Sequence, residues 1–397
     1  MAIGVLIRLP VRHEQSDDFR YFLVHWYRFI QQHGGFHALK DTGFSDYNVP
    51  YLYVLAALTY LPVSPLTGIK AVSVAFDVLQ CFFVFRIVAL RHPRPGAWQP
   101  FAAALLAMVL PTVATNSGWW AQSDAIYTSF VLGALWFVLR GRSWGACAML
   151  GLALAFKLQA VFVFPFLLVM LLTRQVRWRS LLAVPAVFLA LDVPALLLGA
   201  DPVGLLTVYS RQTDTYPQLT LNAPSLYQFV ASPTDPDRLD AVRRAGIVGA
   251  GLVVIALIAL AVLSRTGRLA LRGGAGRPAL TPNQVLLTAL CSAIAVPFLL
   301  PSMHDRYFYV ADVLSLVAAF YLPRRLWFAP VLVQAASFAS YLPYVRHRPD
   351  RDPEAYAWSP FGWHLIAGAM AAALAVVLVT TALEYRKGPA AAGVEPV

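Results

Sequence analysis

Charged residues are scarce in this 397-residue chain, and acids are scarcer than bases. Asp, Glu, Lys and Arg make up 13% of the residues, whereas hydrophobic residues make up 59%. Such a balance excludes an ordinary soluble domain, because too few charges remain to cover a water-facing surface. It predicts an all-α polytopic protein whose main partner is the lipid bilayer.

Cysteine is also rare, and its spacing excludes two classes of site. Cys81, Cys147 and Cys291 are the only cysteines, and each stands alone inside an apolar segment. Disulfide frameworks and thiolate metal sites need paired or clustered cysteines. We therefore interpret all three as core fillers.

The formal net charge of +11 could indicate a nucleic-acid partner, but the distribution of the bases argues against one. Lys and Arg collect in short tracts between apolar segments, as the positive-inside rule predicts for cytoplasmic turns. The tracts assigned to the cytoplasm are 91–94, 140–142, 174–179, 265–277, 324–325 and 386–387. The Gly-rich part of the fourth tract, 272–277, lacks the strand and helix of a phosphate loop, so we interpret it as a linker.

Five other turns are then expected to face outward: 116–124, 157–159, 201–240, 301–308 and 346–360. The last one contains three arginines that break the rule, partly offset by three acids. Between the turns we expect roughly 11–12 transmembrane helices, among them spans at 69–90, 100–115, 285–300 and 362–383. The predicted order is a catalytic membrane module (1–199), an outer loop (200–244) and a C-terminal membrane module (245–397).

The first outer loop is expected to cover residues 11–66. The run 49–61 is too short to cross a bilayer, so we predict an interfacial helix there, the second in this loop. Residues 1–9 supply only about half the length of a crossing, so either the first helix is unusually short or the start codon is late. No cleavable signal peptide fits this beginning.

The loop opens with Ser16-Asp17-Asp18-Phe19-Arg20, followed by apolar residues at three- and four-residue spacing as far as Ile30. This spacing predicts an amphipathic helix on the membrane surface. Ser16 or Asp17 suits the N-cap, and acids suit a first turn, so capping and solvation could explain the pair of carboxylates. Alternatively, Asp18 is a catalytic base.

Cations are expected at the same outer boundary. His304 and Arg306 follow one span and precede the next, and Arg306 offers a planar fork for phosphate oxygens. Lys157 lies in a short hairpin and could bind phosphate as a point charge. The alternatives without a catalytic role are a surface ion pair between Asp305 and Arg306 and, for Lys157, a snorkelling lysine.

Several polar residues could bind substrate or order the outer loops. Gln122 and Asp124 open a span beside two tryptophans that we interpret as interfacial anchors. Asp46 is interpreted as a helix cap, and Asp192 has no evident partner in the sequence. The candidates for substrate binding or loop ordering are Asp17, Gln122, Asp124, Gln159, Asn222, Tyr227 and Asp305.

An outward-facing site would constrain the chemistry. Nucleotide sugars are cytoplasmic, so glycosyl transfer on this side would use a sugar attached to a lipid phosphate. The leaving phosphate needs cations, whereas the acceptor hydroxyl needs a base, for which Asp18 is the candidate. Direct attack on the anomeric carbon would invert its configuration.

The motifs together resemble bacterial GT-C glycosyltransferases related to the GPI mannosyltransferases, in order along nearly the whole chain. The segments that carry the resemblance are Ser16-Asp-Asp-Phe with His25-Trp-Tyr, Ser45-Asp-Tyr-Asn-Val-Pro-Tyr-Leu-Tyr, Trp120-Ala-Gln-Ser-Asp-Ala-Ile-Tyr, Ala155-Phe-Lys-Leu-Gln-Ala, Leu221-Asn-Ala-Pro-Ser-Leu-Tyr and Met303-His-Asp-Arg-Tyr-Phe. Each motif is weak alone, but their order and spacing are fairly specific.

The resemblance implies a GT-C-like bundle, a polyprenyl-phosphate-sugar donor, an inverting transfer and an essential acid in the first outer loop. That acid corresponds to Asp18, whereas Asp17 stands where members often have glycine. Members usually show His-Glu-Arg where this chain has His304-Asp305-Arg306, so the acid here is shorter. Mannose is favoured by the family name alone, and the acceptor could be a glycan, a glycolipid or a protein. The expected location is the bacterial cytoplasmic membrane with the site facing outward.

Two alternatives come from other classes. A multi-pass transporter or flippase would show inverted repeats and charges near the midplane, whereas the charges here are expected on one side. A non-catalytic assembly subunit is the other. No cofactor and no metal ligand set is indicated, although the sequence leaves a divalent cation open.

Overall fold

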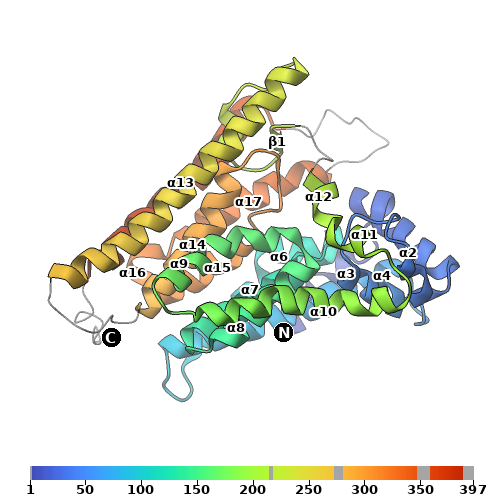
Figure 1. Cartoon of the computed structure of the whole chain (residues 1–397), viewed down its shortest axis with the longest axis horizontal. Coiled ribbons are helices and arrows are strands. Elements are labelled where there is room, and N and C mark those ends of the chain that lie inside the picture. Colours follow the sequence, from blue (N-terminus) through green and yellow to red (C-terminus); the bar gives the residue numbers. More distant parts are fainter. Residues whose placement is uncertain (1, 214–217, 272–279, 347–357, 388–397) are drawn as a thin grey trace.

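The computed structural model describes residues 2–213, 218–271, 280–346 and 358–387. The described residues are mostly helical, and their helices form one elongated bundle with residues 19–58 at one end (Figure 1). The all-α prediction is therefore confirmed for these residues. The proposed Gly-rich linker and most of the expected outer turn 346–360 lie outside them.

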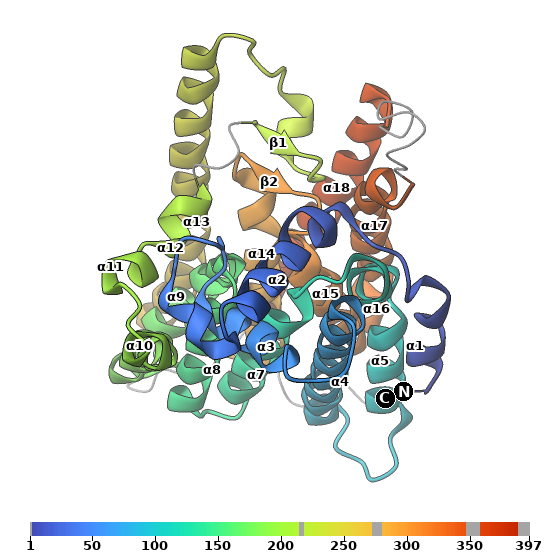
Figure 2. The same ribbon diagram turned by 90° about the vertical axis from the view of Figure 1, so that its right-hand side faces the viewer.

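The first segment of the chain folds into six short helices, of which the last four pack together at that end of the bundle and the first lies apart from them (Figure 2). They are α1 (Ala2–Leu6), η1 (Leu9–Val11), η2 (Phe19–Leu23), α2 (Val24–Gln32), η3 (Gly35–Lys40) and α3 (Val49–Leu58). The helix α1 is as short as expected. Arg8, just after it, donates to Asp77 over 2.9 Å and to Ser117 over 2.8 Å, so buried polar contacts join this segment to the bundle.

The amphipathic helix predicted after Asp18 is present as η2 followed directly by α2. Its apolar face was expected to rest on the membrane, and this is wrong for most of that face. Leu23 and Ile30 are buried in a cluster with Leu39 and Leu55, which η3 and α3 contribute. Protein side chains cover this face because the second apolar helix of the loop, α3, packs back onto it, and the protein core therefore fixes Asp18.

Five helices are long and apolar enough to cross a membrane by length and composition: α4 (Pro65–Arg91), the η6–α10 segment (Trp178–Leu197), α13 (Pro236–Leu271) over Pro236–Ser264, α14 (Pro282–Leu299) and α18 (Pro360–Arg386). Within the helical segment η6–α10, η6 is Trp178–Leu182 and α10 is Ala183–Leu197. Only 11% of the apolar window of α13 is buried, and this helix runs along the outside of the bundle (Figure 1). These helices support a multi-pass membrane protein.

A sixth crossing is possible where a single straight span was expected at 100–115. The segment instead forms α5 (Trp98–Val109), then α6 (Pro111–Thr115) and the π-helical turn η4 (Asn116–Trp120), bent by 48°. The bend follows from Pro111, because a proline forces the preceding residue out of the helical conformation. Leu110 accordingly has φ −51° and ψ 133°.

The remaining apolar helices are shorter, except the last one, which has 18 residues like α14. They are α7 (Asp124–Leu139), α8 (Ser143–Phe156), η5 (Leu158–Val163) with α9 (Phe164–Leu172), α15 (Tyr309–Tyr321), α16 (Pro323–Leu326) and α17 (Ala329–Arg346). The count of 11–12 crossings stays a prediction, because it requires several of these helices to span. The outer loop predicted at 200–244 contains α11 (Pro202–Leu206), α12 (Val208–Thr213) and η7 (Leu226–Phe229), and α13 already begins at Pro236.

A short parallel strand pair joins two of the predicted outer turns. The strand β1 (Thr220–Leu221) pairs with β2 (Met303–His304), with Leu221 opposite His304 (Figure 2). The amide of Asp305 continues the pairing by donating to the carbonyl of Leu221 over 3.0 Å. This contact fixes the backbone immediately before Arg306.

Candidate active site

Four segments that are far apart in the sequence deliver polar side chains to one place. Asp18 comes from the start of η2, Gln122 from the turn after η4, Lys157 from the α8–η5 hairpin and Arg306 from the turn after β2. All four line one cavity. The sequence predicted that these residues share an outer boundary, and the structure brings them into a single constellation.

Asp18 is the most heavily contacted of these groups. Its Oδ2 accepts hydrogen bonds from Arg306 Nη1 at 2.9 Å, Trp120 Nε1 at 2.8 Å and Gln122 Nε2 at 2.5 Å. The side chain keeps 25% of its surface exposed. One oxygen is therefore held by three donors, while the carboxylate still reaches the cavity.

Ser16, not Asp18, caps the helix. Ser16 Oγ accepts from the amide of Phe19 over 3.2 Å and donates to the carbonyl of Trp120 over 2.7 Å. Asp18 makes no side-chain cap bond. Because Ser16 supplies the cap and the link to η4, the capping interpretation does not account for Asp18.

A second, deeper ion pair stands behind the first. Lys157 Nζ lies 2.5 Å from Asp124 Oδ1, and the two side chains are 6% and 1% exposed. Asn116 Nδ2 donates to Asp124 Oδ2 over 2.7 Å, and Arg306 Nε lies 3.8 Å from the same oxygen. The snorkelling interpretation of Lys157 is therefore wrong, because a buried carboxylate partner makes an inward orientation favourable.

The four charged groups form a row in the order Asp18, Arg306, Asp124, Lys157. Two carboxylates alternate with two cations, so the row is neutral in this state. The Arg306 guanidinium also lies over the Trp120 ring at 5.6 Å, and Lys157 lies over the Tyr47 ring at 5.8 Å. Any anionic ligand must therefore compete with carboxylates that are already in place.

The cavity beside this row is small. Its volume is about 110 Å³, and it is lined by Asp18, Phe22, Leu23, Trp26, Asp46, Tyr47, Gln122, Phe156, Lys157, Gln159, His304, Arg306 and Tyr307. Small-molecule sites usually measure about 300–1,000 Å³. A sugar phosphate would require the walls to move apart, and Phe22, which is 37% exposed, is the most exposed apolar residue of the wall.

Burial by itself would raise the pKa of Asp18. The charge of Arg306 lowers it, and so do the hydrogen bond from Trp120, the charge of His304 and the hydrogen bond from Gln122. The net result is a pKa below the usual value of an aspartate. The neighbouring Asp305 behaves differently. Its carboxyl is fully buried, and burial raises its pKa despite His304, whose Nδ1 lies 3.5 Å away. The pKa values of the two acids are thus shifted in opposite directions, with that of Asp18 lowered and that of Asp305 raised.

Local backbone geometry explains how the donors reach Asp18. Both η2 and η4 are single π-helical turns, which are often found at functional sites. The turn η4 ends at Ala121, a fully buried residue with φ 61°, a left-handed conformation that side chains rarely adopt. This reversal lets Trp120 and Gln122, on either side of it, donate to the same carboxylate oxygen.

Three predicted residues have other positions. Asp17 is partly exposed and its side chain makes no hydrogen bond or ion pair within the described part of the chain. Asn222 donates to the Tyr344 hydroxyl over 2.9 Å, and Tyr227 packs against Gly246 of α13, so both are outside the cavity wall. Loop ordering fits Asn222 and Tyr227 better than substrate binding.

Trp120 was misjudged from the sequence. A tryptophan at a span end predicts an interfacial anchor, yet Trp120 is only 3% exposed and donates to Asp18. Its ring also packs against Tyr341 and Tyr344, with centroids 5.1 and 5.3 Å away. No local signal separated it from Trp119, because the difference arises from the π-helical turn.

Among the described residues, no group of three or more His, Cys, Asp or Glu side chains could hold a metal ion. In comparisons with known proteins, no family model matches the chain and no curated protein matches it significantly.

Proposed function

We propose that this protein is an inverting glycosyltransferase of the GT-C type, which moves a sugar from a polyprenyl-phosphate donor to an acceptor hydroxyl on the outer face of a bacterial cytoplasmic membrane. One observation carries the proposal: Asp18 and Arg306 form a pair that reaches an aromatic-lined cavity, at the end of a bundle of apolar helices. The motif resemblance supports the same class, and mannose is the sugar that it favours.

The donor would bind through its phosphate. A phosphodiester carries one negative charge, and the phosphate released when the sugar leaves carries a second. Arg306 and Lys157 would supply fixed cations where this charge develops. His304 lines the same cavity and offers a further donor.

Asp18 would accept the acceptor's proton. As the hydroxyl oxygen bonds to the anomeric carbon, the bond from that carbon to the phosphate oxygen breaks and its electron pair goes to the phosphate. The hydroxyl proton goes to Asp18, which is ionised at neutral pH because its pKa is held low. Since nucleophile and leaving group lie on opposite sides of the carbon, the configuration inverts.

The Asp18–Arg306 pair also suggests an order of events. In the resting state Arg306 neutralises Asp18 at 2.9 Å. When the donor phosphate takes over part of Arg306, Asp18 loses a stabilising charge and becomes a stronger base. Donor binding would thus activate the base before the acceptor reacts.

The experiment that tests this function is incubation of the purified protein with a panel of polyprenyl-phosphate sugars and candidate acceptors. We expect release of polyprenyl phosphate with one donor and formation of a glycoside of opposite anomeric configuration. The variant Arg306→Ala should lose this activity, and its matched control is Arg20→Ala, which removes an exposed arginine from the helix that follows Asp18. No release with any donor, together with substrate counterflow in proteoliposomes, would support the transporter instead.

A further inference from the structure

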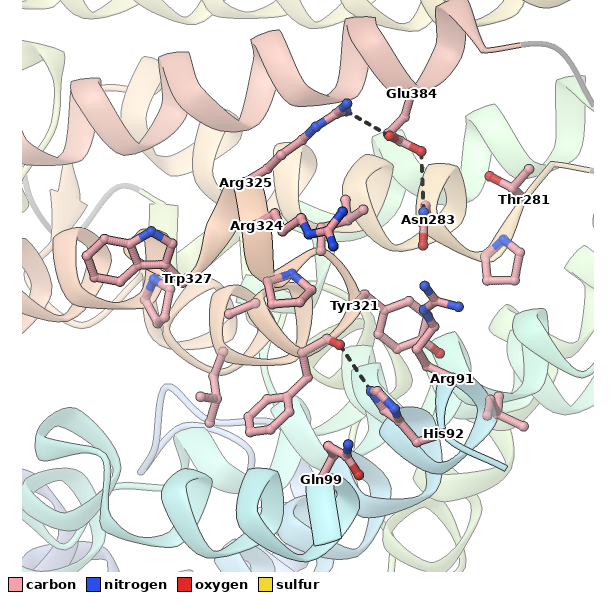
Figure 3. A pocket seen from close by; sticks show the side chains of 18 of the residues that line it. Arg91, His92, Gln99, Thr281, Asn283, Tyr321, Arg324, Arg325, Trp327 and Glu384 are labelled. Carbon is pink, nitrogen blue, oxygen red and sulfur yellow. Dashed lines mark hydrogen bonds and ion pairs between the residues drawn. The ribbon is translucent and has the colours of Figure 1, made fainter. Parts of the chain in front are cut away.

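A second, larger groove lies at the opposite end of the bundle from Asp18. Its volume is about 1050 Å³, and it is formed by the ends of α4, α14, α15 and α18 with the start of α5 and the short helix α16 (Figure 3). The helix α4 connects the two regions: its Lys70 contacts the carbonyl of Glu14, close to Asp18, and its last residue, Arg91, lines the groove. At 1.5 Å per residue the 27 residues of α4 span about 40 Å.

The walls of this groove are basic. Arg91, His92, Arg324, Arg325 and Lys387 line it together with a single acid, Glu384. Glu384 is already neutralised, because Arg325 Nη1 and Lys387 Nζ lie 2.9 and 2.6 Å from its Oε1. Asn283 Nδ2 donates to the other oxygen over 3.3 Å.

Two cations remain without a carboxylate partner in the part of the chain that the structure describes. Arg91 and Arg324 are both exposed, and both guanidinium groups point into the groove, from the end of α4 and from α16 (Figure 3). His92 differs, because its Nε2 donates to the carbonyl of Phe320 over 3.3 Å. The groove thus offers two guanidinium forks that no acid within residues 2–213, 218–271, 280–346 and 358–387 satisfies.

Apolar surface and interfacial aromatics accompany these charges. Leu106, Leu316 and Phe320 line the groove, and Trp98 and Trp327 on its walls are each 67% exposed. Exposed tryptophans at the ends of apolar helices are typical of the boundary between acyl chains and headgroups. Basic pockets between such helices suit the headgroups of anionic lipids.

We propose that this groove binds an anionic phospholipid, with the headgroup phosphate on Arg91 and Arg324 and the acyl chains along the apolar wall. The charge complementarity and the apolar wall favour a lipid over a soluble phosphate, which would leave that wall without an occupant. The proposal is independent of the glycosyltransferase function, since the groove and Asp18 lie at opposite ends of the bundle.

The test is a titration of the purified full chain with phosphatidylglycerol, measured by native mass spectrometry, with phosphatidylcholine as the neutral reference. The variant Arg91→Gln/Arg324→Gln is compared with Arg142→Gln/Arg179→Gln, two exposed arginines at the same end of the bundle but outside the groove. A basic side chain near an anionic headgroup contributes about fivefold in affinity, so the groove variant should bind about 25-fold more weakly. The control pair should retain the affinity of the wild type.

A third variant, Arg91→Lys/Arg324→Lys, separates charge loss from misfolding and should keep most of the affinity. Equal phosphatidylglycerol affinity in the wild type and the glutamine groove variant would overturn the proposal. Displacement of the lipid by millimolar inorganic phosphate would also overturn it, because the occupant would then be a soluble anion. Retention of phosphatidylglycerol under that competition supports the lipid.

Discussion

Arg306 donates from Nη1 to Oδ2 of Asp18 at 2.9 Å, across 288 residues of sequence. This contact connects the start of η2 with the turn before α15. It means that the proposed base and the proposed phosphate ligand neutralise each other in the resting protein. In the mechanism that we propose, donor binding and base activation are therefore coupled through one guanidinium group.

Arg306→Ala should weaken donor binding and slow transfer, because the leaving phosphate loses a two-pronged cation. Hydrogen bonds to charged groups contribute about 1.5–3 kcal/mol, so we expect roughly a 10- to 150-fold loss of kcat/KM. Arg306→Lys should recover only part of it, since an ammonium lacks the planar fork. Donor affinity and turnover equal to those of wild type in Arg306→Ala would remove this residue from the site.

The acidic limb of the pH–rate profile should move to higher pH in Arg306→Gln. The pKa of Asp18 is held low by Arg306 against the effect of burial, and removing the charge leaves burial dominant. In the wild type the Asp18–Arg306 pair stabilises the folded state at pH values above about 3.9, the pKa of Asp in an unfolded chain. This stabilisation is lost as the pH falls through the lower pKa of Asp18 in the folded state. A profile of kcat/KM against pH measures the limb, and an unshifted limb would mean that another group is the base.

Breaking the Lys157–Asp124 pair should destabilise the protein more than removing both charges. Asp124→Asn leaves a buried ammonium without its 2.5 Å partner, a change that costs about 3–5 kcal/mol in comparable pairs. Asp124→Asn/Lys157→Gln should recover much of this loss in a thermal unfolding assay, but not the transfer activity. If the single variant were as stable as wild type, the pair would not be a structural anchor of the site.

Residues 11–66 are predicted to lie outside, with α3 not crossing the membrane. Single cysteines at His37 and Ser64 are introduced into a background without the three native cysteines. Both positions are exposed, and they precede and follow α3 in the sequence, so both should react with an impermeant thiol reagent added from outside. Labelling of only one position would show that α3 spans. Labelling of neither would place the whole loop inside.

The sequence was sufficient to identify three charged groups of the site. Lys157 stood out because it lies between two short apolar runs, and Asp18 and Arg306 stood out because each lies just before a predicted helical segment at the membrane boundary. Which carboxylate pairs with which cation could not be predicted, since the packing of α7, α15 and the β1–β2 pair brings Asp124 and Arg306 together. Trp120 was missed for a related reason, because a π-helical turn, and not its sequence context, directs it inward.

The fold was predicted unevenly. Apolar length identified α4, α14 and α18 well, because lipid crossing and core packing require the same composition. The bend at Pro111 and the early start of α13 were not anticipated, although proline chemistry explains the first. The burial of the α2 face was misjudged, because an amphipathic pattern does not reveal whether lipid or protein covers the apolar side.

Asp18→Asn tests the central claim most directly. Asparagine keeps the shape of the side chain and can still accept from Trp120 and Gln122, but it cannot take a proton. General-base catalysis contributes roughly 10²- to 10⁴-fold, so we predict that transfer falls by about that factor while folding and donor binding are retained. Asp17→Asn, one residue away and without a contact to the site, is the matched control and should stay near the wild-type rate. Turnover by purified Asp18→Asn at the wild-type rate would contradict the assignment of Asp18 as the base.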